Sequence, residues 1–250
     1  MTPPLSTILR EAGGLEYRRI TAATHPTLLV LLCHGYGAPG TDLVPIGEEL
    51  IQASSRVAEE VVFLFPEAPL SLGGFPGFEQ RAWWQIDIAA LELALARGEA
   101  RDRKGECPRE LDDLRPRLSA ILDRERQIEG EDTTLPMDRV IVGGFSQGAM
   151  LTTDFVLRSE TAPGGLALLS GTLLCEDVWR EAAPRAKGVR ILQSHGRQDP
   201  LLPFFAAEEL RSILAGAGAD VRFVPFEGQH EIPLPVFVAL RDLLHASLGE

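Results

Sequence analysis

Short apolar runs alternate along the chain with segments in which apolar residues recur at helical spacing. Most of these runs are continuously apolar, as expected for strands that are buried on both faces of a parallel sheet. The predicted strands span residues 15–20, 27–35, 61–68, 139–146, 165–171, 189–196 and 220–228. The predicted helices span residues 42–58, 80–97, 109–129, 147–160, 204–216 and 233–248. Because strands and helices alternate, the pattern predicts an α/β fold, a doubly wound and mostly parallel sheet with helices on both faces.

Two segments depart from this regular pattern. Residues 15–20, LEYRRI, alternate between apolar and polar positions, which predicts an antiparallel strand at the N-terminal edge of the sheet. Residues 97–135 are rich in charge and interrupt the regular spacing of elements. The second half of this excursion is expected to form an amphipathic helix packed on the sheet. Its apolar residues at helical spacing are Leu111, Leu114, Leu118, Ile121 and Leu122.

The first half of the excursion, residues 97–108, is expected to be a solvated surface loop, with a mobile lid over a site as the alternative. The chain shows no internal repeat and no low-complexity linker. We therefore expect one α/β domain over residues 1–250.

Composition and charge limit the classes of protein that fit. Hydrophobic residues make up 45% and charged residues 24% of the 250 positions, which is ordinary for a soluble globular protein. The formal net charge of −12 argues against nucleic-acid binding and against docking on anionic lipid, because both need clustered Lys and Arg. No run of 18 apolar residues occurs, so we expect no stable membrane insertion.

The cysteines and the N-terminal segment predict a cellular location. Cys33, Cys107 and Cys175 are odd in number, widely scattered and without CxxC or metal-ligand spacing, so thiols in a reducing compartment are expected. The N-terminal segment, MTPPLSTILREAGG, lacks the basic start and long apolar stretch of a secretory signal. Both observations favour a cytoplasmic location.

A candidate nucleophile follows the predicted strand at 139–146. Residues 144–148, GFSQG, match GxSxG and lie between a strand and a helix, where glycines allow the sharp turn that presents a serine at the end of the sheet. A tight structural turn with an incidental serine is the alternative. Ser146 is a poor nucleophile at neutral pH unless a base takes its proton.

The candidate base is His230, in the segment EGQHEIP just past the last predicted strand. The candidate acid is Asp199, directly beyond the predicted strand at 189–196. Asp177 and Asp220 are weaker candidates because one opens a helix and the other begins a strand. Nucleophile, acid and base then follow one another in the chain order that is typical of an α/β-hydrolase.

An acyl-transfer site also needs N–H donors for the oxyanion that forms on the substrate. Gln147, the first residue of the helix after the nucleophile, supplies one backbone donor. The Gly-rich loop CHGYGAPG at 33–40 follows an early strand, and Tyr36 is the candidate for the second. Without the candidate nucleophile, acid and base, this loop would be interpreted only as a flexible turn.

The segments CHGYGAPG, FPEAP, RAWWQID, GGFSQGAM, LSGTL, HGRQDPLLP and EGQHEIP together resemble the phospholipase/carboxylesterase family of α/β-hydrolases, which includes the acyl-protein thioesterases. The resemblance covers about residues 27–245 and is interrupted by the excursion at 97–135. It implies a Ser146–Asp199–His230 triad and an oxyanion hole from the amides of Tyr36 and Gln147. It also implies hydrolysis of carboxylic esters or thioesters with neither metal nor organic cofactor.

The substrate groove is less well defined by the sequence. The resemblance suggests that RAWWQID borders it, with Trp84 or Phe75 as the surface that faces the acyl chain; Leu72 and Leu202 are further candidates. We expect an apolar groove with few fixed charges, which suits uncharged acyl chains of medium length better than acidic ones.

The leading hypothesis is a serine esterase or thioesterase acting on a small-molecule or lipid-like ester. A serine peptidase on the same fold and a catalytically idle α/β-hydrolase that serves as a binding module are the alternatives. A homodimer is compatible with an exposed apolar face on an edge helix.

Overall fold

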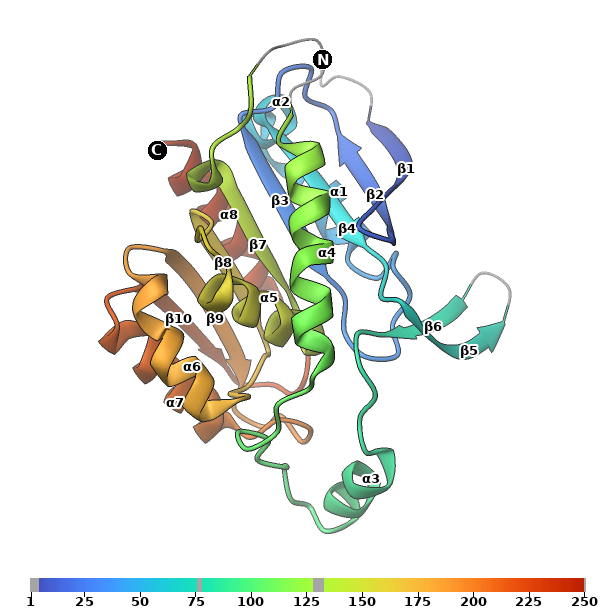
Figure 1. Ribbon diagram of the computed structural model, residues 1–250, viewed down its shortest axis with the longest axis vertical. Helices are drawn as coiled ribbons and strands as arrows, with labels where there is room; N and C mark the ends of the chain where they lie inside the picture. Colours follow the sequence, from blue (N-terminus) through green and yellow to red (C-terminus); the bar gives the residue numbers. More distant parts are fainter. Residues whose placement is uncertain (1–4, 76–77, 128–132, 250) are drawn as a thin grey trace.

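The computed structural model describes residues 5–75, 78–127 and 133–249, and a mixed sheet with helices on both sides forms its centre (Figure 1). In the described residues the sheet has eight strands in the order β1-β2-β4-β3-β7-β8-β9-β10. The six strands β4, β3, β7, β8, β9 and β10 are parallel to one another. In contrast, β2 pairs antiparallel with β4, and β1 pairs antiparallel with β2. The strands are β1 (Ser6–Ala12), β2 (Leu15–Thr21), β3 (Leu28–Cys33), β4 (Val61–Pro66), β7 (Val140–Phe145), β8 (Gly165–Leu169), β9 (Arg190–Gly196) and β10 (Asp220–Phe226).

Two layers of helices cover the sheet. Apolar residues of α1, α2 and α8 pack on one face, and those of α4, α5, α6 and α7 pack on the other. Figure 1 shows α4 to α7 on the near side of the sheet and α8 behind it. The helices are α1 (Val44–Ala53), α2 (Ser55–Glu60), α3 (Ile88–Ala96), α4 (Glu110–Glu125), α5 (Gln147–Arg158), α6 (Glu176–Ala182), α7 (Phe204–Gly216) and α8 (Leu234–Leu248), with 3₁₀ turns at Met137–Arg139 and Ala183–Ala186.

The predicted α/β fold is confirmed, and so is the interpretation of the continuous apolar runs as central strands. Every residue of β3, β4 and β8 is buried. The prediction for the edge is wrong in one respect, because β2 has β1 on its outer side. Most side chains of β1 are exposed, and Leu9 is 57% exposed, so this strand carries no apolar pattern that would reveal it.

Two of the predicted helices differ from the structure. The segment 42–58 is divided at Ser54, whose hydroxyl oxygen accepts a hydrogen bond from the N–H of Val57 and caps α2. The segment 80–97 begins instead as a strand, since β6 (Phe78–Ala82) pairs with β5 (Leu70–Phe75) in a hairpin that projects from the body (Figure 1). The helix α3 begins only after Asp87, whose carboxylate accepts from the N–H of Ala90. Sequence periodicity did not separate hairpin from helix.

The charged excursion behaves as predicted in its second half. It forms α4, and the five apolar residues that predicted this helix are all buried: Leu111, Leu114, Leu118, Ile121 and Leu122. Residues 128–129 of the predicted helix lie outside the described residues.

A buried carboxylate fixes α4 against the N-terminal strands. Glu125 is 8% exposed, and its Oε1 accepts hydrogen bonds from the Tyr17 hydroxyl at 2.6 Å and from Arg10 Nη1 at 2.9 Å. Its Oε2 accepts from Arg19 Nε at 3.0 Å. Burial of the phenol, together with its hydrogen bond to the Glu125 carboxylate, raises the pKa of Tyr17 well above its ordinary value. These polar contacts join the C-terminal end of α4 to β1 and β2, while its apolar residues pack in the core.

The cysteines contradict the expectation of three thiols. Cys107, in the first half of the excursion, forms a disulfide with Cys175, which lies 68 residues further along the chain directly before α6. Cys33 is the free thiol and is buried in β3. An odd number of cysteines leaves one unpaired but does not prevent the other two from pairing, and their approach depends on tertiary structure. Within the described residues, no helix is both long and apolar enough to cross a membrane.

We expect Glu125→Ala to lower the free energy of unfolding by about 3 kcal/mol, because it leaves two arginines and a tyrosine hydroxyl without their common acceptor. The exposed carboxylate of Asp123 on the same helix, which pairs with Arg126 at the helix C-terminus, provides the matched control, and Asp123→Ala should cost less than about 1 kcal/mol. Urea unfolding followed by circular dichroism measures both. Equal effects would contradict the importance assigned to the buried carboxylate.

Candidate active site

Ser146 occupies a strained turn between β7 and α5. Its φ of 55° lies in the left-handed region that residues with a side chain seldom adopt. The neighbouring glycines permit the turn, since a Cβ on Gly144 would stand 2.3 Å from the carbonyl oxygen of Cys33, and one on Gly148 would stand 2.1 Å from the same atom. The end of β3 and the start of α5 therefore approach more closely than any side chain allows. This arrangement corresponds to the turn predicted from GFSQG.

The residue after the serine anchors a second segment. Gln147 is 1% exposed, and its side-chain Oε1 accepts from the N–H of Trp83 while its Nε2 donates to the carbonyl of Trp84, at 2.9 and 2.8 Å. As the first residue of α5, Gln147 has a backbone N–H with no acceptor in its own helix. Its backbone thus remains available at the helix N-terminus while its side chain fixes the RAWWQID segment.

The loop after β3 is held by a buried histidine. His34 is 1% exposed; its Nδ1 donates to the carbonyl of Gly35 at 2.8 Å, and its Nε2 accepts from the N–H of Ala68 at 3.1 Å. This pair of contacts requires the neutral ring with the proton on Nδ1. Burial lowers the pKa of His34 to about 4. A further bond, from the N–H of Gly37 to the carbonyl of Arg81, ties the loop to the end of β6.

Asp199 and His230 meet at the ends of β9 and β10. The Nδ1 of His230 lies 2.6 Å from Oδ2 of Asp199, and the other carboxylate oxygen accepts from the N–H groups of Leu201 and Leu202 at 2.9 and 3.0 Å. Burial opposes the charge of this carboxylate, but its hydrogen bonds, and above all the one from His230, hold the pKa of Asp199 below its ordinary value. The carboxylate is therefore ionised at neutral pH and orients the imidazole ring, which also packs on Phe145 at a centroid distance of 4.7 Å.

The remaining histidine at this edge has a structural position. His195 is fully buried, its Nε2 lies 3.0 Å from the carbonyl oxygen of Leu202, and burial lowers its pKa. Through this contact it supports the loop that carries Asp199.

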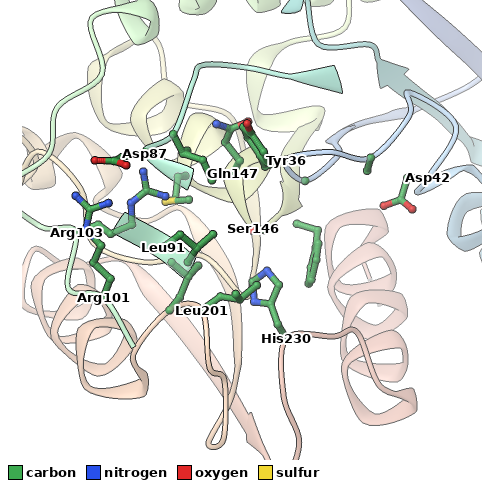
Figure 2. A pocket seen from close by; sticks show the side chains of 16 residues that line it. Tyr36, Asp42, Asp87, Leu91, Arg101, Arg103, Ser146, Gln147, Leu201 and His230 are labelled. Carbon is green, nitrogen blue, oxygen red and sulfur yellow. The ribbon is translucent and has the colours of Figure 1, made fainter. Parts of the chain in front are cut away.

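These parts open on one cavity of about 190 Å³ (Figure 2). Ser146, His230, Tyr36 and Gln147 all line it. Its larger apolar side chains are those of Ile86, Leu91, Phe145, Met150, Leu201 and Leu202. The structure thus brings the predicted nucleophile, base and both predicted oxyanion residues to one cavity, with the predicted acid bonded to the base behind it.

Three of the four residues predicted to face the acyl chain, Trp84, Phe75 and Leu72, lie outside this cavity. Trp84 is 1% exposed within the core, and Phe75 is 66% exposed on the β5–β6 hairpin, where it stacks on Phe78. Neither lines the cavity, and neither does Leu72, whereas Leu202 does. The sequence shows a tryptophan pair beside a Gly- and Pro-rich segment. It does not show that the side chain of Gln147 holds the backbone of that pair inside the core.

Charged residues of the cavity were missed by the sequence analysis. Arg101 and Arg103 come from the half of the excursion that was expected to be a solvated loop, and Asp42 and Asp87 complete the charged lining. The expectation of a groove with few fixed charges is therefore wrong. Burial raises the pKa of Asp42. Among the described residues, no three His, Cys, Asp or Glu side chains gather as a set of metal ligands.

The sheet topology and the serine turn define an α/β-hydrolase, and comparison with known proteins gives its family. Residues 16–248 match the model of the phospholipase/carboxylesterase family, so the chain belongs to that family. It hydrolyses ester or thioester bonds as a serine hydrolase.

Similar proteins agree with this assignment. Acyl-protein thioesterase 1 of Neurospora crassa is 27% identical over 231 residues, covering 90% of this chain and 89% of the relative. Acyl-protein thioesterase 1 homolog 1 of Dictyostelium discoideum is 32% identical over 173 residues, covering 68% of this chain and 66% of the relative. The crystal structure of esterase PE8 has the same fold, with a TM-score of 0.71 and 23% identity over 97% of this chain and 98% of that one.

The neutral ring of His34 predicts a pH-dependent stability. Between its ordinary pKa of about 6.5 and a pH of about 4, His34 is protonated in the unfolded chain but neutral in the folded protein. Stability therefore falls as the pH falls through this window. Between pH 7 and pH 5 this amounts to about 2 kcal/mol. Urea unfolding of the wild type and of His34→Gln at both pH values isolates the contribution, and the variant should lose about 2 kcal/mol less. Equal losses in the two proteins would contradict the account.

Proposed function

We propose that Ser146 is the nucleophile of this hydrolase, His230 its general base and acid, and Asp199 the residue that orients His230. The observation that carries the proposal is the 2.6 Å bond between His230 Nδ1 and Asp199 Oδ2, in a ring that lines the same cavity as the strained serine. With Nδ1–H bonded to the carboxylate, Nε2 is left as the basic nitrogen.

The reaction proceeds through an acyl-enzyme. Ser146 Oγ bonds to the acyl carbon while its proton passes to Nε2 of His230. The tetrahedral intermediate then expels the alcohol or thiol, which takes that proton, and leaves the acyl group on the serine. Water attacks the acyl carbon by the same route, so that a carboxylic acid is released and Ser146 is restored. Throughout, Asp199 stabilises the imidazolium without taking its proton.

The oxyanion is proposed to lie between the backbone N–H groups of Tyr36 and Gln147. The N-terminus of α5 adds its positive dipole at this point. Both donors are held by buried partners, His34 on one side and Trp83 with Trp84 on the other, so little reorganisation accompanies the reaction. Losing one such donor costs about 3 kcal/mol of transition-state stabilisation.

The cavity and the relatives support a substrate class. An apolar lining of leucine, isoleucine, methionine and phenylalanine suits the hydrocarbon part of a small or lipid-like ester. Two similar proteins are named acyl-protein thioesterases, which supports a thioester as well as an oxygen ester. The peptidase and the idle binding module, considered from the sequence, gain no support from these relatives. The proposal treats the chain as one domain that supplies the nucleophile, the acid, the base and both oxyanion donors itself. It includes no nucleic acid and leaves a homodimer open.

Ester and thioester substrates with acyl chains from acetyl to palmitoyl test the proposed roles. We expect turnover to peak at one chain length in the wild type. Ser146→Ala should abolish it, and Asp199→Asn should lower kcat about 10⁴-fold because the imidazole then holds the wrong tautomer. Circular dichroism checks that the variants fold. Activity retained by Ser146→Ala would refute the assignment of the nucleophile.

We further propose a cytoplasmic location for the protein. In that compartment thiols are kept reduced, so the pair that forms a disulfide in the structure would be open inside the cell. Cells lysed directly into denaturant and alkylating reagent should therefore yield three alkylated cysteines per chain, counted by mass spectrometry. Alkylation of Cys33 alone, with the bond from Cys107 to Cys175 intact, would place the protein in an oxidising compartment instead.

A further inference from the structure

Two arginines on the wall of the catalytic cavity are not used by the mechanism described above. Arg101 and Arg103 both line the cavity that holds Ser146. Figure 2 shows their guanidinium groups on the side that carries Asp87, across the cavity from Asp42. They are unusual in a chain with 24 basic and 36 acidic residues, which as a whole repels anions.

One carboxylate serves both guanidinium groups. Arg103 donates to Oε2 of Glu106 from Nε at 2.9 Å and from Nη2 at 2.8 Å, and Nη2 of Arg101 lies 2.8 Å from Oε1 of the same residue. These three residues therefore carry an excess of one positive charge. Asp87 lines the same side, but its carboxylate caps α3, and no ion pair within 4 Å joins it to either arginine, although all of these residues are described.

The backbone that carries the arginines is fixed. The carbonyl of Lys104 accepts from the N–H of Glu176, and the carbonyl of Glu106 accepts from the N–H of Cys175, both at 2.9 Å. Arg103 is only 9% exposed. The two cations are thus part of a built wall and not side chains of a loose surface loop.

A purely structural ion cluster would not need both cations. Arg103 alone already neutralises the charge of Glu106, through two hydrogen bonds that both end on Oε2, and Arg101 lies at the other oxygen, Oε1. Arg101 adds a second guanidinium at the cavity, and its side chain is 33% exposed, so it is reachable by a molecule in the cavity. Guanidinium groups match carboxylate and phosphate oxygens in geometry and charge.

We propose that Arg101 and Arg103 bind an anionic group, a carboxylate or a phosphate, on the ester or thioester that this enzyme cleaves. The inference rests on the proposed function, since it places the scissile bond at Ser146. The apolar lining then holds the hydrocarbon part of the substrate, and the arginines select the substrates that carry a negative charge away from the scissile bond. The anion belongs either to the far end of the acyl group or to the leaving group.

Two matched pairs of substrates test the proposal and distinguish these sources. The p-nitrophenyl monoester of adipic acid is compared with its methyl-capped counterpart, which lacks the charge on the acyl end. Butyrylglycerol 3-phosphate is compared with butyrylglycerol, which lacks the charge on the leaving group. In one of the pairs, the charged member should have a kcat/KM about tenfold higher or more, mainly through a lower KM.

Variants then connect the preference to the wall. Arg101→Gln should lower the charged-to-neutral ratio of kcat/KM about tenfold, and Arg103→Gln should do the same where circular dichroism shows that it folds. Arg222→Gln is the matched control, because it removes an equal charge from the exposed Arg222 on β10, a residue outside the cavity lining. It should leave the ratio unchanged.

The outcomes are separable. Two results would overturn the proposal that the arginines bind an anion, and neither would affect the proposed esterase activity. One is a wild-type enzyme that prefers the neutral member of both pairs, and the other is an Arg101→Gln variant that keeps the wild-type ratio. A wild-type enzyme that hydrolyses none of the four substrates would overturn the proposed function itself.

Discussion

The close approach of β3 to the junction of β7 and α5 is the constraint on which the site depends. The carbonyl oxygen of Cys33 occupies the space where a side chain of Gly144 or Gly148 would lie. This contact requires glycine at both positions, and between them the chain turns sharply at Ser146, which places the serine at the carboxyl edge of the sheet and at the N-terminus of α5. It also places the loop after β3 next to the serine, so the nucleophile and the proposed oxyanion donors come from one packing contact.

Buried polar contacts then hold the loops around this point. Gln147 fixes the Trp83–Trp84 backbone, and neutral His34 fixes the loop after β3. The carboxylate of Asp199 accepts hydrogen bonds both from backbone N–H groups and from His230. Each contact satisfies a group that would be costly to bury alone, and each reduces the movement needed during acyl transfer. Chemistry and stability therefore depend on the same side chains, and His34 links the two without lining the cavity.

The sequence predicted the parts whose signals are local. Continuous apolar runs marked the central strands, and chain order with position after a strand selected Ser146, Asp199 and His230. It did not predict the exposed strand β1, which has no apolar periodicity, nor the hairpin that preceded α3. The burial of Trp84 and the entry of Arg101 and Arg103 into the cavity depend on contacts between distant segments. The pairing of Cys107 with Cys175, 68 residues apart, is of the same kind.

The central claim, an acyl-transfer nucleophile at Ser146 that is activated by His230, is tested most directly by covalent trapping. The protein is treated with one equivalent of a fluorophosphonate, and its intact mass and its peptides are measured. The account predicts a single adduct per chain, located on Ser146, and labelling that is slowed at least 100-fold in His230→Ala. An adduct on a different residue, or equal labelling of His230→Ala, would contradict it.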